Sequence, residues 1–313
     1  MNSVSLFFGK HRSALLSLFF ILAYLLCVSL IMPVRKDHIF LVIVYIGLIL
    51  LKRHAFARDV IPLLMAWLSY DSLRGFVDHV VYRVSGQWAL DLDVLLLGWL
   101  FNGQSPPIWF HEHGGILWVT AFTGIFYIGY IVFSVFFALY LWFTRHRGGR
   151  NYEYYWQFVI SFFIIALLGM TTFYLLPTAP PWYYEKCGFT YPCADYEGGP
   201  DTARLNDVDA LLGVPVFASF YSLESNPFAA FPSLHVGYPV LAALLSRRKW
   251  GRKGEVVWLF PLIVAFSAMY LNHHWFIDVV AGFVYGWVSF TLGTRIVGYY
   301  RRKYLKKTGT APV

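Results

Sequence analysis

The sequence predicts an all-α integral membrane protein with about eight transmembrane helices and an amphipathic outer segment. Of its 313 residues, 58% are hydrophobic and 13% are charged, whereas about a quarter of a typical soluble domain is charged. The apolar residues gather in runs near the length that crosses a bilayer. The cations, which give a net charge of +8, stand at the ends of these runs. That placement indicates membrane topology and argues against nucleic-acid binding.

The apolar runs predict eight membrane spans. They cover residues 13–32, 38–51, 59–80, 115–143, 155–176, 232–246, 255–271 and 275–298. With both termini in the cytoplasm, 18 of the 25 Lys and Arg residues lie on the cytoplasmic side and five on the other. This asymmetry is the positive-inside pattern of membrane proteins. The five on the other side are Arg35, Lys36, Arg83, Lys186 and Arg204.

Two long segments fall on the non-cytoplasmic side. Residues 81–114 are amphipathic and too short to span, and residues 91–101 either lie flat in the interface or re-enter the membrane. Residues 177–231 are long for a plain connector and suggest a loop that covers or shapes a site. The predicted organisation is N-terminal spans with an interfacial helix (1–114), a catalytic six-helix-type core with the outer loop (115–300 with 177–231), and a basic cytoplasmic tail (301–313).

Cysteine use agrees with this topology. Cys187 and Cys193 both lie in the outer loop, where a disulfide would close a small hairpin, and a pair of free thiols is the alternative. Cys27 lies in the first span. The sequence has no Cys-x-x-Cys pair or companion Cys/His cluster, so no metal site is expected.

Two short stretches carry most of the candidate chemistry. Residues 231–235 read Phe-Pro-Ser-Leu-His, and residues 272–278 read Asn-His-His-Trp-Phe-Ile-Asp. The span count places both at the same non-cytoplasmic face, where they can form one site. Asp278 follows His274 by four residues, so a helix would bring both side chains onto one face. With His235 nearby, they offer a nucleophile or base, its orienting group and an acid.

Other polar residues are weaker candidates. Ser233, at a helix start, can offer its hydroxyl and backbone N–H to an anion such as phosphate. His273 either binds substrate or sits at the membrane interface. Asp71 and Arg74 are three residues apart in the third span. They form either a self-contained ion pair or a site in which Arg74 reaches an anionic headgroup.

Both stretches resemble motifs of the type-2 phosphatidic acid phosphatase superfamily. Residues 232–235 resemble its Pro-Ser-Gly-His motif, and residues 267–278 resemble its Ser-Arg-x5-His-x3-Asp motif, with Ala268 where arginine would stand. The family's Lys-x6-Arg-Pro motif is missing before the outer loop. The absent cations would hold a phosphate monoester, which carries nearly two negative charges. A site without them is better matched to a singly charged phosphodiester.

These variants, with Pro-Pro-Trp-Tyr at residues 180–183, are similar to the inositol phosphorylceramide synthase branch of that superfamily. The resemblance implies a phosphatase-type helical core and a headgroup phosphotransferase that uses neither metal nor cofactor. It would move a phospho-headgroup, expected to be phosphoinositol, from a phospholipid donor to a lipid hydroxyl such as that of ceramide. The alternatives are a lipid phosphate or diphosphate phosphatase of the same superfamily and a non-enzymatic lipid transporter or scaffold.

The resemblance also implies roles for single residues. His274 would attack phosphorus and form a phosphohistidine, Asp278 would orient it, and His235 would act as acid and then as base. The active site would face the periplasm or the exterior in a prokaryote and the Golgi lumen in a eukaryote. The aromatic start of the outer loop would shape the substrate site and keep water away. Its residues are Pro181, Trp182 and Tyr183.

Overall fold

Helices form the regular structure in the part of the chain that this computed structural model describes, and no strand occurs there. This confirms the predicted all-α class. The described residues are 15–308 without 17, 20, 28, 31, 52, 146–150, 197, 199–200 and 223–225. The predicted cytoplasmic cations Lys10, Arg12, Lys52, Arg147 and Arg150, and residues 309–313 of the predicted tail, lie outside them. The chain divides into two compact units, Met1–Val77 and Asp78–Val313.

The first unit contains the helices of the predicted N-terminal spans. Described residues between 15 and 29 are helical, followed by α2 (Lys36–Leu50) and α3 (His54–Ser72). Ile21, Tyr45 and Ala57 form their buried core. At about 1.5 Å per residue, α2 is roughly 22 Å long, which is shorter than the ~30 Å hydrocarbon core of a bilayer.

The predicted span 59–80 is not one continuous α-helix. Helix α3 ends at Ser72, and the chain continues as a 3₁₀ turn (Leu73–Phe76) and the single-turn helix α4 (Val77–Val80). The Ser72 hydroxyl donates to the carbonyl of Ser69 at 2.6 Å, a local bond that competes with helix continuation. Gly75 in the next turn also has low helix propensity.

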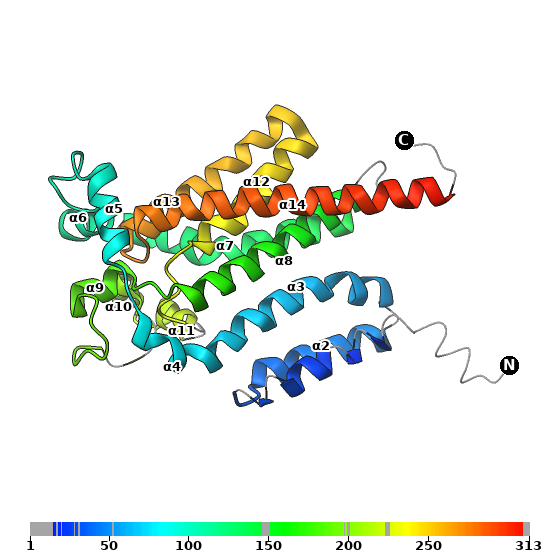
Figure 1. The fold of residues 1–313 in the computed structure, drawn as a ribbon, viewed down its shortest axis with the longest axis horizontal. Helices are drawn as coiled ribbons and strands as arrows, with labels where there is room; N and C mark the ends of the chain where they lie inside the picture. Colours follow the sequence, from blue (N-terminus) through cyan, green and yellow to red (C-terminus); the bar gives the residue numbers. More distant parts are fainter. Residues whose placement is uncertain are drawn as a thin grey trace. The chain divides into compact units, whose positions relative to one another are not determined.

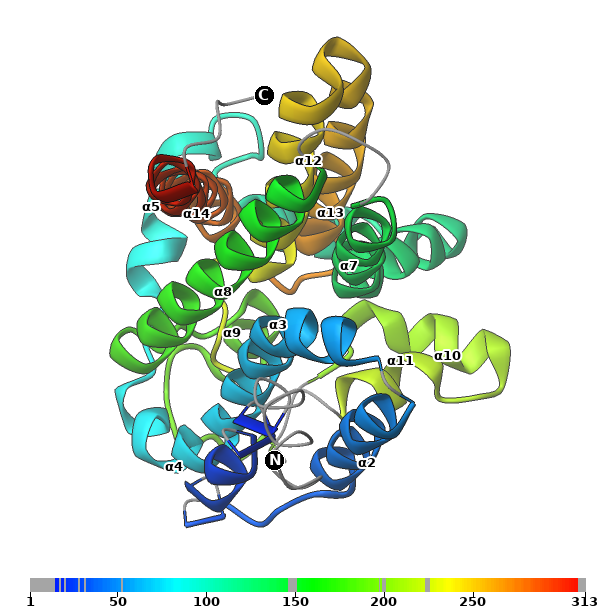
Figure 2. The ribbon, with the colours of Figure 1, turned by 90° about the vertical axis from the view of Figure 1, so that its right-hand side faces the viewer.

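The second unit is built around α12 (Leu234–Trp250). Figures 1 and 2 show it among α7 (Leu117–Phe143), α8 (Asn151–Leu175), α13 (Leu259–Tyr270) and α14 (Phe276–Thr308), all of which it contacts. Glycine permits the closest approach. A Cβ added to Gly282 of α14 would lie 2.4 Å from the carbonyl oxygen of Ser233, so the start of α12 packs directly on α14. Small residues serve the same purpose between many membrane helices.

Four helices in the described part of the chain are long and apolar enough to cross a membrane: Leu117–Phe143, Asn151–Leu175, Leu234–Tyr270 and Phe276–Lys303. The third of these reverses direction through the 3₁₀ turn Gly251–Trp258, which separates α12 from α13. A Cβ on Gly254 would lie 2.1 Å from the carbonyl oxygen of Ser246, although eight residues of straight helix would separate them by about 12 Å. The count of eight spans stays a prediction.

Residues before α7 and the outer loop form short helices. They are α5 (Gln87–Leu97), α6 (Pro106–His113), α9 (Pro181–Cys187), the 3₁₀ turn Ala203–Leu205, α10 (Asn206–Leu212) and α11 (Val216–Tyr221). Helix α5 is only about 16 Å long. Its Leu95 is exposed and its Asp93 is buried. Helices α5 and α6 lie in the second compact unit, and the predicted division of the chain at residue 114 stays a prediction.

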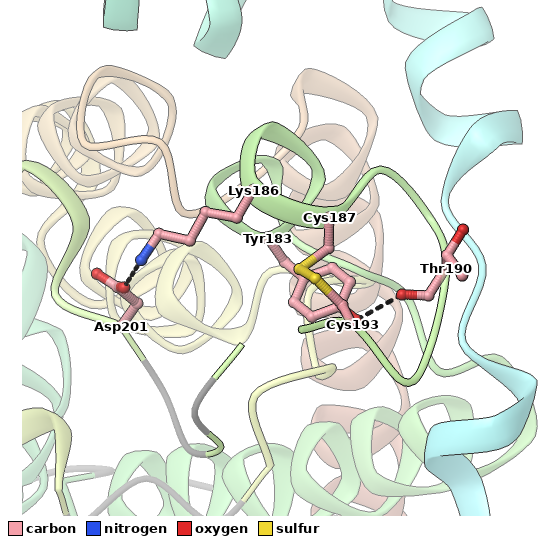
Figure 3. Close-up of a disulfide and its surroundings, with 6 residues drawn as sticks. All are labelled: Tyr183, Lys186, Cys187, Thr190, Cys193 and Asp201. Carbon is pink, nitrogen blue, oxygen red and sulfur yellow. Dashed lines mark hydrogen bonds and ion pairs between the residues drawn. A yellow bond between two sulfur atoms is a disulfide. The ribbon is translucent and has the colours of Figure 1, made fainter. Parts of the chain in front are cut away.

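A disulfide joins the expected pair of cysteines in the outer loop (Figure 3). Cys187 ends α9, and Cys193 lies six residues further along the chain. The hydroxyl of Tyr183 donates to the carbonyl of Thr190 inside the loop so closed, at 2.8 Å. Lys186 of α9 pairs with Asp201, which ties α9 to the next stretch of the outer loop.

Candidate active site

The start of α12 carries the first histidine of the candidate site. Ser233 is the N-cap residue of α12, and its backbone N–H donates to the carbonyl of Asp278 at 2.9 Å. That N–H is therefore not available to an anion, whereas the buried hydroxyl of Ser233 has no hydrogen-bond partner among the described residues. The bond fixes the first turn of α12, including His235, against the first turn of α14.

His274 and His235 face each other. The Nε2 atom of His274 lies 3.2 Å from Nδ1 of His235, although the two residues are 39 positions apart in the sequence. The structure thus brings together the two stretches that the sequence singled out. A phosphorus atom attacked by one imidazole would be next to the other.

The main chain sets the tautomer of His274. Its Nδ1 lies 2.9 Å from the carbonyl oxygen of Ala230. A carbonyl only accepts, so Nδ1 must carry the proton, and Nε2 of the neutral ring is left with a free lone pair. This is the nitrogen that faces His235, which makes Nε2 the nucleophilic or basic atom.

Asp278 supports the same ring from a greater distance. Its Oδ2 lies 3.5 Å from Nδ1 of His274 and accepts the backbone N–H of Trp275 at 2.9 Å. A carboxylate at the third position of a helix that reaches back to the preceding N–H is a common capping arrangement. Asp278 therefore orients the segment that carries His274 and adds a negative charge beside the ring, while Ala230 makes the shorter hydrogen bond.

Asp93 of α5 is a residue that sequence reasoning missed. Its two carboxylate oxygens accept the backbone N–H groups of Phe276 and Ile277 at 2.8 and 2.9 Å. These are donors in the first turn of α14 that have no partner within the helix. Burial raises the pKa of the Asp93 carboxyl to about 7. The available signal was an acidic residue, two positions after Asp91, within an otherwise apolar amphipathic segment.

His273 points into a stack of aromatic rings. It lies between Tyr127 and Tyr221, with ring centroids 5.0 and 4.9 Å away, and its Nε2 is 2.6 Å from the hydroxyl of Tyr221. Burial and the neighbouring His274 lower the pKa of His273 to about 3, so this ring is neutral at physiological pH. Its predicted contact with substrate stays a prediction.

Tyr127 of α7 is a second residue that the sequence did not indicate. Its ring stacks on His235 with centroids 4.1 Å apart, and its hydroxyl lies 3.2 Å from Nδ1 of His235. The tyrosine therefore holds the plane of the imidazole and offers it a hydrogen-bond partner. Tyr127 falls within a long apolar run rich in aromatic residues, so nothing in the local pattern distinguishes it.

The aromatic start of the outer loop packs behind the histidine segment. Pro181, Trp182 and Tyr183 are all buried at the beginning of α9. The backbone N–H of Trp182 donates to the carbonyl of Asn272 at 3.0 Å, which docks α9 directly beside His273 and His274. These three residues are placed where they can exclude water, and their predicted contact with substrate stays a prediction.

Asp71 and Arg74 lie in the other compact unit, Met1–Val77. Their charged groups are 3.8 Å apart, and Asp71 is 2.7 Å from Nε2 of His38. The predicted pair therefore includes a histidine that the sequence did not connect with it. Whether Arg74 reaches a lipid headgroup stays a prediction.

Within the described residues, no group of three or more His, Cys, Asp and Glu side chains is arranged to hold a metal ion. The site instead consists of two imidazoles, one of them held by a carbonyl and a carboxylate, at the packed starts of two membrane helices. Residues 96–292 match the family model described as PAP2 superfamily. The chain belongs to this superfamily.

Within the superfamily, the chain falls in the inositol phosphorylceramide synthase-like branch. It is 30% identical over 293 residues to a phosphoinositol dihydroceramide synthase of Bacteroides thetaiotaomicron, across 89% of this chain and 91% of that protein. It is 35% identical over 130 residues to the inositol phosphorylceramide synthase catalytic subunit AUR1 of Saccharomyces cerevisiae, across 40% of this chain and 30% of the yeast protein. No solved structure is detectably similar to the chain.

Proposed function

We propose that the protein moves phosphoinositol from phosphatidylinositol to the hydroxyl of a ceramide-type lipid. The observation that carries this proposal is the 3.2 Å approach of His274 Nε2 to His235 Nδ1, with the other nitrogen of His274 held by a carbonyl. The similar bacterial protein, whose length this chain covers almost completely, is named for the same kind of transfer.

In the first half of the reaction, His274 Nε2 attacks the phosphorus of the donor diester. A phosphorus–nitrogen bond forms as the bond from phosphorus to the diacylglycerol oxygen breaks. His235, in its protonated form, gives its proton to that oxygen, so diacylglycerol leaves as an alcohol. Asp278 and the carbonyl of Ala230 stabilise the positive charge that develops on His274.

In the second half, the hydroxyl of the acceptor lipid attacks the phosphohistidine. His235, now neutral, takes the hydroxyl proton as the new phosphorus–oxygen bond forms and the phosphorus–nitrogen bond breaks. One site thus serves donor and acceptor in turn. The buried aromatic residues Trp182 and Tyr183 support the exclusion of water, which would otherwise hydrolyse the intermediate.

The surroundings of the histidines favour a diester over a phosphate monoester. Ala268 stands where the phosphatase motif has arginine, and it is fully buried in the core of α13. Its carbonyl accepts the backbone N–H groups of His273 and His274 at 3.0 and 3.1 Å. This position therefore contributes a main-chain acceptor and no cation.

The proposed arrangement in the membrane follows the charge asymmetry of the sequence. Both termini lie in the cytoplasm, and the histidine site opens on the opposite face, where the outer loop covers it. The eight-span count belongs to this proposal. Single cysteines at the exposed positions of Tyr82 and Arg302 test this arrangement. When intact cells are treated with a thiol reagent that cannot cross the membrane, only Tyr82→Cys should react.

The activity is tested with purified protein in lipid nanodiscs. Incubation with phosphatidylinositol and ceramide should yield diacylglycerol and a phosphoinositol-bearing sphingolipid in equal amounts. It should also yield a phosphohistidine, found by mass spectrometry, in the absence of acceptor. Release of inorganic phosphate from phosphatidic acid, with no diacylglycerol from phosphatidylinositol, would establish the phosphatase alternative instead.

A further inference from the structure

Arg204 is a buried cation beside the segment that carries the histidines. Arg204 lies three positions after Asp201, which pairs with Lys186 of α9 (Figure 3). Only 6% of Arg204 is exposed. One terminal nitrogen, Nη2, donates to the carbonyls of Phe110 and His111 at 2.6 and 2.7 Å. The other two nitrogens, Nε and Nη1, make no hydrogen bond of good geometry among the described residues, and the guanidinium lies 4.9 Å from the centre of the Tyr270 ring.

Asn272 presents a complementary acceptor. Its amide nitrogen donates to Oε2 of Glu185 at 2.7 Å, whereas its own Oδ1 is buried without a hydrogen-bond partner among the described residues. The backbone of Asn272 has a φ of 66°, in the left-handed region that asparagine tolerates better than most residues. Buried donors and acceptors that stay unpaired are costly in a finished fold, and a bound polar ligand is one way to satisfy them.

Glu185 connects these groups. Its Oε2 also lies 3.4 Å from Nε2 of His111. Burial raises the pKa of Glu185 to about 7, and the nearby Arg204 opposes this rise. The cluster therefore combines a fixed cation with a carboxyl group that can donate or accept a hydrogen bond, according to whether it holds its proton. Such a set is poorly matched to a phosphate and well matched to neutral hydroxyl groups, each of which both donates and accepts.

The cluster is adjacent to the nucleophile. Asn272 precedes His274 by two residues, and its carbonyl accepts the N–H of Trp182 at 3.0 Å. Glu185 lies on the same short helix as Trp182. The chain therefore places the unpaired donors and acceptors beside the segment that carries His274. The lowered pKa of His273 has other causes, which are its burial and the neighbouring His274.

We propose that Arg204, Glu185 and Asn272 form a subsite that binds the hydroxyl groups of a cyclic polyol headgroup while its phosphate is held at His274. This inference rests on the proposed function. These three residues would select the donor by its headgroup, which the catalytic histidines cannot do because they act on the phosphorus and on the oxygens of the leaving and attacking groups.

The test compares two donors in nanodiscs that contain ceramide. Phosphatidylinositol carries the polyol ring, and phosphatidylmethanol is a diester of the same charge without it. We expect Arg204→Lys and Glu185→Gln each to lower the ratio of turnover on the first donor to turnover on the second by about 10- to 100-fold, because each removes charge-assisted hydrogen bonds to hydroxyls. An unchanged ratio, or an equal loss on both donors, would overturn the subsite.

Matched controls are Arg83→Lys and Glu255→Gln, which alter an exposed arginine bonded to a carbonyl and an exposed glutamate in the turn after α12. Both should keep the wild-type ratio. Free myo-inositol gives a second measurement that does not need turnover, should Arg204→Lys not fold. It should raise the melting temperature of the wild type more than that of Glu185→Gln, and equal increases would count against the subsite.

The two proposals fail in different ways. If the proposed transfer is wrong, the wild type releases no diacylglycerol from phosphatidylinositol, yet myo-inositol still stabilises the wild type more than Glu185→Gln. If the subsite alone is wrong, the wild type performs the transfer and Glu185→Gln keeps the full preference for the polyol donor.

Discussion

The two compact units each contain a buried histidine next to an aspartate, and the two pairs differ in what the second ring nitrogen does. In the N-terminal unit, Nε2 of His38 bonds Asp71 at 2.7 Å, and Nδ1 accepts the backbone N–H of Arg35 at 3.4 Å. In the second unit, Nδ1 of His274 bonds Ala230 and approaches Asp278, while Nε2 faces His235.

Under the proposed mechanism, this difference separates a structural pair from a reactive one. Both nitrogens of His38 are used by the fold, so this ring has no lone pair to offer a substrate. His274 has the weaker contact with its carboxylate, at 3.5 Å, but it keeps one nitrogen for chemistry. A short histidine–carboxylate bond is therefore a poor sign of catalysis by itself, and a second nitrogen that faces another titratable side chain is a better one.

The largest effect should come from His274→Ala. It removes the atom that forms the covalent intermediate, so we expect turnover to fall by about four orders of magnitude or more. Mass spectrometry should find no phosphoenzyme after incubation with donor alone. A phosphoenzyme that persists in this variant would transfer the nucleophilic role to another residue.

Asp278→Asn should have a smaller effect. The carbonyl of Ala230 still sets the tautomer, so the variant loses mainly the charge that stabilises His274 when it becomes positive. We expect kcat to decrease by about 100- to 1,000-fold with little change in KM. Steady-state kinetics with phosphatidylinositol measures both constants, and wild-type kcat would remove Asp278 from the mechanism.

His38→Ala tests the other side of the comparison. It deprives the buried Asp71 of a hydrogen-bond donor, which should lower the free energy of unfolding by about 1–3 kcal/mol. Turnover per folded molecule should stay within about twofold of the wild type. Chemical denaturation and an assay normalised to folded protein measure the two quantities, and a large loss of kcat without loss of stability would contradict a structural role.

Asp93 offers a third kind of buried carboxyl group, one with no imidazole beside it. Its pKa is raised from 3.8 to about 7 in the folded protein, so the folded state binds this proton more tightly than the unfolded chain. Stability should therefore decrease as the pH rises from about 4 to about 7, by at most about 1.4 kcal/mol per pH unit. In Asp93→Asn, the loss of stability between about pH 4 and about pH 7 should be smaller. The loss that remains comes from Glu185, whose pKa is also raised.

Denaturation midpoints of the wild type and Asp93→Asn between about pH 4.5 and 8 measure this change. Asp91→Asn is the matched control, because Asp91 lies two residues away on the exposed side of α5. The same pH dependence in all three proteins would show that Asp93 does not titrate in this range.

The sequence predicted the meeting of His235, His274 and Asp278 because each stretch marks a helix start and the span count brings both starts to one face. It also separated residues 232–246 from 255–271, which correspond to the two arms of the α12–α13 reversal. The spacing of four residues correctly placed Asp278 near His274, even though α14 begins only at Phe276.

The missed residues share a physical cause. Asp93 and Tyr127 reach the site from helices distant in the sequence, and Ala230 acts through its main chain, which carries no side-chain signal. Arg204 was read only as a topology marker, because its burial depends on how the outer loop folds over α6. The predicted third span is interrupted at Ser72, where a local hydroxyl bond competes with the helix, and hydropathy does not register such a bond.

The carbonyl of Ala230 has a consequence for how this site can change over time. A side chain at position 230 can be exchanged without removing the carbonyl oxygen that holds His274. A substitution there therefore does not by itself change the tautomer of His274. Two backbone hydrogen bonds position this oxygen instead. The N–H of Thr178 donates to the carbonyl of Phe228 at 2.9 Å, and the N–H of Ala230 donates to the carbonyl of Thr178 at 3.4 Å. A backbone shift at the first residues of the outer loop would therefore move a catalytic proton without altering any ionisable group.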